Sequence, residues 1–217
     1  LKKLDDELGI ILFSTPFDES AVDFLEEMNI PCYKIASYEV NDFLLLRKVA
    51  STGKPVIISL GYASIKDADF AIKTLRESGA KEISALHCVT GYEENPDLSA
   101  MNLATIKDIT DRFNVVSGFS DNNAGIEAPL IAAGLGAKII EKHLILDRST
   151  GGPDARFSLE PQELKTLVEK LKKNERIADE SKINLALGQV HYGPGSATEE
   201  HNKRFRRSLF AVKDIKK

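Results

Sequence analysis

The stretch VVSGFSDNNAGIEAPLIAAGLGAKIIEKHL, residues 115–144, contains one complete strand–helix–strand pattern. Residues 115–121 and 138–144 are short runs rich in β-branched side chains, and residues 125–136 between them carry apolar side chains at helical spacing. A strand that leads through a helix into a second strand usually forms a parallel pair with a right-handed crossover. This unit therefore predicts an α/β fold with a parallel sheet.

The same alternation of short strands and longer helices covers most of the chain. Further strands are predicted at residues 11–16, 32–37, 55–61 and 82–89, and further helices at residues 19–29, 41–52, 64–79, 102–113 and 160–180. Six strand–helix units at this spacing fit either an open parallel sheet or a closed barrel. No strand leads into the G-x-G-x-x-G pattern of dinucleotide-binding sheets, so we favour a (β/α)8 barrel. Residues 1–8 are expected to be the end of a helix that Gly9 terminates.

Composition limits the classes of protein to which the chain can belong. Its 217 residues, 42% of them hydrophobic, suffice for one sizeable core in one or two domains. A net charge of -4 with mixed signs gives no basic field, so neither nucleic acid nor a membrane surface is an expected partner. Cys32 and Cys88 lie in apolar runs, which favours reduced thiols over a disulfide. No run approaches the ~20 apolar residues of a membrane span, and we expect a cytoplasmic protein.

Polar side chains gather where the predicted strands end. They are Thr15; Lys34, Ser37 and Glu39; Ser59; His87, Thr90 and Tyr92; Ser120 and Asp121; and Lys142 and His143. In a (β/α)8 barrel the carboxyl ends of all strands meet at one mouth, which holds the active site. Taken singly, a serine or threonine at a strand end is usually a turn residue, and a lone histidine usually has a structural role. Lys34 differs, because a lysine in a buried strand must reach an anion or lose its hydration without compensation.

Seven motifs, taken together and in this order, resemble the nonulosonic acid synthases. They are FSTPFDESAVDFL (13–25), YKIASYE (33–39), TGKPVIIS (52–59), LHCVTGY (86–92), GFSDNNAGI (118–126), GAKIIEKHLILDRSTGGPD (136–154) and FSLEPQEL (157–164). This family contains the sialic, legionaminic and pseudaminic acid synthases. The resemblance implies an enzyme that joins phosphoenolpyruvate to an N-acetylated hexose and releases phosphate, forming a new C–C bond.

The resemblance also implies a domain order. The family has a (β/α)8 barrel followed by a small antifreeze-like domain, which reaches over the active site of a partner subunit in a homodimer. We expect residues 1–182 to form about six of the eight barrel units and residues 183–217 to be the connector toward that small domain. A barrel with missing units leaves unpaired strand edges, so we expect the 217-residue chain alone to be inactive or to depend on self-association.

The roles of family residues carry over to matching positions of this chain. Phosphoenolpyruvate would bind to Thr15, Lys34, Ser37, Ser59, Thr90 and Ser120. The sugar would face Glu39, Tyr92 and Asp154. A divalent metal, manganese or else magnesium, would bind to His143 and Asn122. Glu39, Lys34 and His143 would take part in catalysis, whereas the resemblance gives no clear role to Glu141 or Lys142.

The chain departs from the family pattern at two places near the expected site. Asn122 stands where the family motif S-D-H has its second metal-binding histidine, and an amide oxygen is a weaker ligand for manganese or zinc than an imidazole. In SLGYA (59–63), Leu60 and Tyr62 replace residues of a typical S-T-G-M and are expected to reshape the mouth.

The sequence leaves alternatives open for the sugar substrate and for the reaction. The stretches DARFSLEP (154–161) and VHYGPGS (190–196) resemble the pseudaminic acid branch more than the sialic acid branch. A catalytically weakened homologue that still binds phosphoenolpyruvate or a sugar is the second hypothesis, motivated by Asn122. The third is another aldolase-like barrel enzyme, in which Lys34 would form a Schiff base.

Overall fold

Five parallel strands form one sheet, in the order β1-β2-β3-β4-β5, in the computed structural model, which describes residues 1–215. The strands are β1 (Tyr33–Ile35), β2 (Val56–Ser59), β3 (Ile83–Val89), β4 (Val116–Asp121) and β5 (Ile140–Lys142). Each strand pairs with its neighbours in the sequence, and within the described residues β1 and β5 do not pair with each other. The sheet is therefore a parallel half-barrel, which confirms the predicted α/β class.

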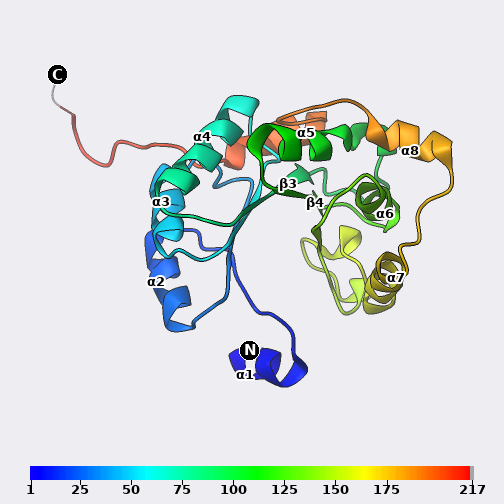
Figure 1. Cartoon of the computed structure of the whole chain (residues 1–217), viewed down its shortest axis with the longest axis horizontal. Coiled ribbons are helices and arrows are strands. Elements are labelled where there is room, and N and C mark those ends of the chain that lie inside the picture. Colours follow the sequence, from blue (N-terminus) through cyan, green and yellow to red (C-terminus); the bar gives the residue numbers. More distant parts are fainter. Residues whose placement is uncertain (216–217) are drawn as a thin grey trace.

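Helices precede, connect and follow the strands. They are α1 (Lys2–Leu8), α2 (Glu19–Glu27), α3 (Phe43–Ser51), α4 (Ile65–Glu77), α5 (Ala104–Phe113), α6 (Glu127–Gly134), α7 (Pro161–Lys172), α8 (Glu180–Leu187) and α9 (Ala197–Asn202). Helices α2, α3 and α4 flank one end of the sheet, and α5, α6 and α8 lie around β3 and β4 (Figure 1). Among the residues that the structure describes, no helix is both long and apolar enough to span a bilayer.

Short polar residues start several of these helices, as the chain pattern predicts. Asp18 and Asp42 cap α2 and α3 by accepting a hydrogen bond from a backbone N–H of the first turn. Ser64 and Asp67 form a reciprocal capping box at α4. At the other end of a helix, Gly9 adopts the left-handed conformation that terminates α1, which confirms the predicted glycine stop.

The predicted strand at residues 11–16 is wrong. Only one residue of it, Ser14, forms a parallel bridge, with Tyr33 of β1, and its carbonyl accepts the N–H of Lys34 at 3.1 Å. Ile11 remains 71% exposed. The physical reason is that a strand needs a ladder of hydrogen bonds, and the described structure offers this segment one short neighbour on one side only.

The single long helix predicted at residues 160–180 is also wrong. Helix α7 ends at Lys172, Asn174 follows with a φ of 55°, and Asp179 caps a separate helix α8. A left-handed residue and a new cap both interrupt the helical hydrogen bonds, which the charge pattern alone does not reveal. The domain division expected at residue 182 falls inside α8, whose Ala186 is fully buried against the barrel core.

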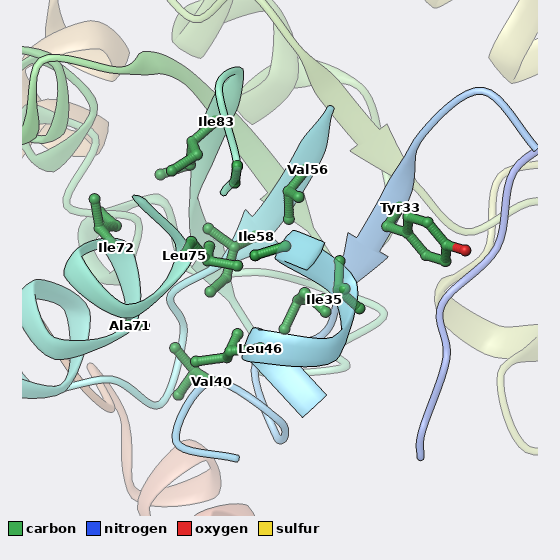
Figure 2. Packing of buried hydrophobic residues seen from close by; sticks show 14 of the residues in the cluster. Tyr33, Ile35, Val40, Leu46, Val56, Ile58, Ala71, Ile72, Leu75 and Ile83 are labelled. Carbon is green, nitrogen blue, oxygen red and sulfur yellow. The ribbon is translucent and has the colours of Figure 1, made fainter. Parts of the chain in front are cut away.

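Alternation along the strands separates an outer apolar layer from an inner one. Figure 2 shows the outer layer, in which strand residues pack against side chains of α3 and α4. The strand residues labelled there are Tyr33, Ile35, Val56, Ile58 and Ile83. The inner layer is tight at Gly118, where a Cβ atom would lie 2.5 Å from the carbonyl oxygen of Ile139. Because successive side chains point to opposite faces, residues such as Lys34 and Ser59 face the interior of the half-barrel.

Candidate functional site

Two adjoining hollows open at the carboxyl ends of the strands. Both are lined by Lys34, Ala36, Tyr92, Asn122 and Glu141. The first is completed by Ser37, Tyr38, Ser59, Cys88, Thr90 and Ser120, and the second, of about 330 Å³, by Thr15, Phe17, Lys142 and His143. The structure thus brings together all of the residues to which the resemblance gives a role in binding or catalysis except Glu39 and Asp154. Of the other polar side chains expected at the mouth, His87 and Asp121 line neither hollow. Glu141, which the sequence left without a role, lies between the two hollows.

A third hollow, of about 690 Å³, lies at the opposite, amino ends of β3 and β4. Some of its charged side chains have partners: Lys107 bonds to Asp111, and Arg76 donates to the backbone carbonyls of Phe113 and Asn114. We place the candidate site at the carboxyl ends, where a buried lysine and buried hydroxyl groups line one hollow.

Lys34 is the cation at the centre of the site. It is 7% exposed, and among the described residues its Nζ has only two contacts, both long: 3.4 Å to the carbonyl of Ile35 and 3.4 Å to Oε1 of Glu141. An ammonium group carries three donors, so these contacts leave it poorly satisfied. Ser59 lines the same hollow, and its buried Oγ has no partner among the described residues. A buried cation and a free hydroxyl facing one hollow favour an anionic ligand.

The hydroxyl groups of the other two serines of the first hollow already donate to protein atoms. Ser37 Oγ donates to Cys88 Sγ at 3.3 Å and accepts the backbone N–H of Gly61. Ser120 Oγ donates to Oε1 of Glu141 at 2.6 Å. These hydroxyl groups would have to exchange partners in order to donate to a ligand, whereas Ser59 would not.

Cys88 was interpreted from the sequence as a core residue. It is buried, but it also lines the first hollow and lies in register with Ser120, which in turn pairs with Glu141. Burial raises the pKa of the Cys88 thiol, so this side chain stays protonated at neutral pH. In the sequence, only the alternation along β3 could show that Cys88 faces the interior of the half-barrel.

His143 faces Asn122 across the mouth of the second hollow. The distance from His143 Nε2 to Asn122 Oδ1 is 3.1 Å. The Asn122 amide nitrogen donates to the backbone carbonyl of Val89 at 2.9 Å, which leaves Oδ1 directed at the imidazole. Asp154 is more remote, since its carboxylate lies 3.7 Å from His143 Nδ1 and is largely exposed.

One imidazole nitrogen and one amide oxygen are both groups that bind divalent metals, and here they face each other. Within residues 1–215 no group of three or more histidine, cysteine, aspartate or glutamate side chains could hold a metal ion. The pair of His143 and Asn122 therefore fits a cation that is held weakly by the protein and shares its coordination with other ligands.

A buried ion pair holds the loop that carries Asn122. Lys142 Nζ donates to Asp121 Oδ2 at 2.9 Å and to the backbone carbonyl of Asn123. The Asp121 and Lys142 side chains are 1% and 3% exposed. Burial raises the pKa of the Asp121 carboxyl, and the neighbouring Lys142 opposes that rise. This assigns Lys142 a structural role on the outer side of β5.

Glu39 lies outside both hollows. It is 4% exposed, its Oε1 accepts a hydrogen bond from Arg207 Nε at 3.2 Å, and its Oε2 has no partner among the described residues. Thr90, at the end of β3, is likewise engaged by a distant residue, since its N–H and its hydroxyl both donate to Glu199. The sequence missed Glu199 and Arg207, because no motif connects them with the strand ends.

His87 was expected at the mouth, and that expectation is wrong. Its Nε2 bonds to the backbone carbonyl of Met101 at 2.7 Å, and its ring stacks on Phe119. The reason is the alternation of β3, which turns His87 toward the helices and Cys88 toward the interior. Burial lowers the pKa of His87 to about 4, so the imidazole is neutral at pH 7.

Aromatic side chains form one wall of the mouth. The ring centroid of Tyr92 lies 5.1 Å from that of Phe157 and 6.4 Å from that of His143. The ring centroids of Tyr38 and Tyr62 lie 4.7 Å apart with the ring planes tilted by 37°, and the two hydroxyls share a hydrogen bond of 3.0 Å. Tyr62 thus shapes the mouth through Tyr38. The other residue expected to reshape it, Leu60, belongs to the outer core cluster instead.

Comparison with known proteins agrees with this geometry. A model of the NeuB family matches residues 1–182. The chain is 37% identical over 217 residues to the pseudaminic acid synthase of Helicobacter pylori, covering 100% of this chain and 61% of that protein. It is 37% identical over 211 residues to the N,N'-diacetyllegionaminic acid synthase of Campylobacter jejuni, covering 96% of this chain and 60% of that protein.

A solved structure shows the same architecture. The spore coat polysaccharide biosynthesis protein SpsE of Bacillus subtilis superposes with a TM-score of 0.81 at 35% identity, over 91% of this chain and 56% of that chain. The chain spans about three fifths of the length of the two curated relatives described above. The family match and the shared fold confirm the resemblance seen in the motifs: the chain belongs to the NeuB family of nonulosonic acid synthases.

Proposed function

We propose that the protein containing this chain condenses phosphoenolpyruvate with an N-acetylated hexose to give a nine-carbon nonulosonic acid and phosphate. The observation that carries this proposal is a pair of donors in the first hollow: Lys34 Nζ, whose contacts are long, and Ser59 Oγ, which has no partner among the described residues. A small molecule with a phosphate and a carboxylate supplies acceptors for both groups. Membership of the NeuB family supports the choice of phosphoenolpyruvate.

The proposed reaction forms one C–C bond and breaks one C–O bond. C3 of phosphoenolpyruvate forms a bond to the aldehyde carbon of the open-chain sugar, water adds at C2, and phosphate leaves with cleavage of its C–O bond. Lys34 and Ser59 would bind the phosphoenolpyruvate anion, with Thr15, Ser37, Thr90 and Ser120 around it. Tyr92, Asp154 and Glu39 would face the sugar, and Glu39 would also move a proton.

A divalent cation, manganese or magnesium, would be held by His143 and Asn122. When bound, it supplies a Lewis acid that polarises the sugar aldehyde. The two residues fit this role in chemistry. His143 Nε2 now donates its hydrogen to Asn122 Oδ1, and once that proton is lost both atoms could offer a lone pair to a cation. Manganese is the preferred candidate, because it accepts both an amide oxygen and an imidazole nitrogen as ligands.

The pseudaminic acid type of sugar is our choice among the branches. It rests on the stretch DARFSLEP (154–161), because the two synthases compared above are equally identical to this chain. Phe157 of that stretch packs against Tyr92 and His143, which line the hollows, and we propose that it influences the choice of sugar through them. A homodimer is proposed from the resemblance alone.

The test uses the variant Lys34→Met in the protein expressed from its full reading frame. Phosphoenolpyruvate binding is measured by calorimetry, and phosphate release is measured with divalent metal and a panel of N-acetylated hexoses. We expect Lys34→Met to weaken binding about 100-fold or more, because a charge-assisted bond to a buried anion is lost. Its melting temperature should not fall, since a poorly paired buried charge is replaced by an apolar side chain of similar length.

The matched control is Lys54→Met. Lys54 pairs with Glu26 at 2.7 Å, away from the hollows, and its replacement should leave binding unchanged. Equal phosphoenolpyruvate affinity in wild type and Lys34→Met would contradict the proposed site. Binding without phosphate release from any sugar would instead support the weakened homologue that Asn122 motivates, and an adduct trapped on Lys34 by borohydride would support an aldolase.

A further inference from the structure

Residues 195–207, which we call the clasp, follow all of the strands in the sequence and lie against the mouth of the half-barrel. They contain helix α9 and make contact with the carboxyl ends of three neighbouring strands. Glu199 accepts hydrogen bonds from the N–H and the hydroxyl of Thr90 after β3, at 2.5 and 2.9 Å. Arg206 donates to the carbonyl of Tyr62 after β2 at 3.1 Å. The end of the clasp reaches the loop after β1 through Arg207.

Arg207 is held from several directions. Its backbone N–H donates to the carbonyl of Tyr38 at 3.0 Å, and its own carbonyl accepts from the side chain of Asn41 at 3.2 Å. Its Nη2 donates to the carbonyl of Phe17 at 2.8 Å, and its Nε donates to Glu39 Oε1 at 3.2 Å. A guanidinium fixed by its backbone and by a second acceptor has little freedom to turn away from Glu39.

Glu39 needs such a partner. Burial raises the pKa of its carboxyl, and the facing charges are Arg207 and Lys34, which lower that pKa, and Asp42, which raises it. Arg207 is the cation in direct contact. The second carboxylate oxygen, Oε2, is buried and has no partner among the described residues, so Arg207 satisfies only one of the two carboxylate oxygens.

We infer that Arg207 is a positioning residue, which holds the Glu39 carboxylate through Oε1 and leaves Oε2 free to act on the substrate. The inference rests on the proposed function, in which Glu39 faces the sugar and moves a proton. It adds that the clasp, which follows all of the described strands in the sequence, completes the site. Arg207 of the clasp orients Glu39, which lies in the loop after β1.

The experiment compares Arg207→Gln, Arg207→Lys and the control Arg204→Gln in the protein expressed from its full reading frame. Arg204 belongs to the same clasp, but its guanidinium lies over the ring of Phe205. We expect Arg207→Gln to lower kcat about 10- to 100-fold, the range for groups that orient a catalytic side chain. The KM for phosphoenolpyruvate should change little, and Arg204→Gln should match the wild type.

Two further readouts separate positioning from a merely structural role. Loss of the Arg207 charge raises the pKa of Glu39, so the acid limb of the pH–rate profile should move to higher pH in Arg207→Gln and return toward the wild-type position in Arg207→Lys. The double variant Glu39→Gln/Arg207→Gln should be no less active than Glu39→Gln alone, because Arg207 acts through Glu39. Additive losses, or an unchanged acid limb, would overturn the inference.

A direct titration keeps this test independent of the reaction. The Glu39 carboxyl is followed by carbon NMR in wild type and Arg207→Gln, and the pKa of Glu39 should be higher in the variant. If the wild type releases no phosphate with any sugar, the proposed function fails. In that case an equal Glu39 pKa in both proteins would still overturn the contact between Arg207 and Glu39, and a higher one in the variant would support it.

Discussion

Replacing Lys142 with methionine tests the buried ion pair that holds the loop after β4. Methionine has a similar length but no charge, so Asp121 Oδ2 loses its partner in a position where its side chain is only 1% exposed. Removing one partner of a buried ion pair costs about 3–5 kcal/mol. Asp121 Oδ1 keeps two hydrogen bonds from Asn123, both of 3.1 Å, which places the expected loss near the lower value, about 3 kcal/mol.

This loss is measured as the free energy of unfolding in urea and as the melting temperature. A chain of this size loses roughly 2–4 °C per kcal/mol, so about 3 kcal/mol corresponds to a fall of roughly 6–12 °C. The control is Lys138→Met, because Lys138 is exposed just before β5 and its change should stay within about 0.5 kcal/mol.

The double variant Asp121→Asn/Lys142→Met identifies the cause of the loss. It removes both charges, so no ion is left buried without a partner, and it should recover at least half of the lost stability. A loss below about 1 kcal/mol in Lys142→Met would refute this reasoning. So would a double variant that is no more stable than Lys142→Met, because the penalty would then not arise from the stranded carboxylate.

Two other predictions concern the histidine and the amide. The pKa of His87 is lowered from 6.5 to about 4 in the folded protein. Between these pH values the unfolded chain therefore binds more protons than the folded protein. The free energy of unfolding should fall by about 3 kcal/mol as the pH falls from 6.5 to 4. His87→Asn should flatten that part of the urea-midpoint profile, and an equally steep profile would contradict it. Asn122→His should tighten Mn²⁺ binding about tenfold, equivalent to about 1.4 kcal/mol, because an imidazole is the better ligand. Spectroscopic Mn²⁺ titration measures this, and unchanged affinity would argue against a metal between residues 122 and 143.

Much of the mouth was predictable from the sequence because barrel topology converts a local pattern into a spatial one. Lys34, Ser59 and Ser120 end different strands, and parallel strands in register bring such ends to one edge. His87 was wrongly predicted to line the mouth. Whether a strand residue faces the mouth or the helices depends on its place in the inward–outward alternation, and the sequence pattern of β3 did not fix that place. The prediction of a strand at residues 11–16 was wrong because the pattern of side chains does not show whether a neighbouring strand is present to form hydrogen bonds.

The clasp could not be predicted in the same way. Glu199 contacts Thr90 from 109 residues away, and Arg207 contacts Glu39 from 168 residues away. Helix periodicity, capping and turn signals describe residues that are close in the chain, so they contain no information on such pairs. The arginines of RFRRS (204–208) look like any exposed charge run until the strand ends that they meet are in place.

The run IEKH, residues 140–143, shows how one strand serves both structure and site. Glu141 faces the interior, where it contacts Ser120 and Lys34. Lys142 faces the opposite side and stabilises the buried Asp121. His143 faces inward again, just past the end of β5, beside Asn122. Three ionisable groups occur together here because each has its own partner, Glu141 and His143 on the inner side and Lys142 on the outer side. A substitution at one should therefore leave the other two contacts in place.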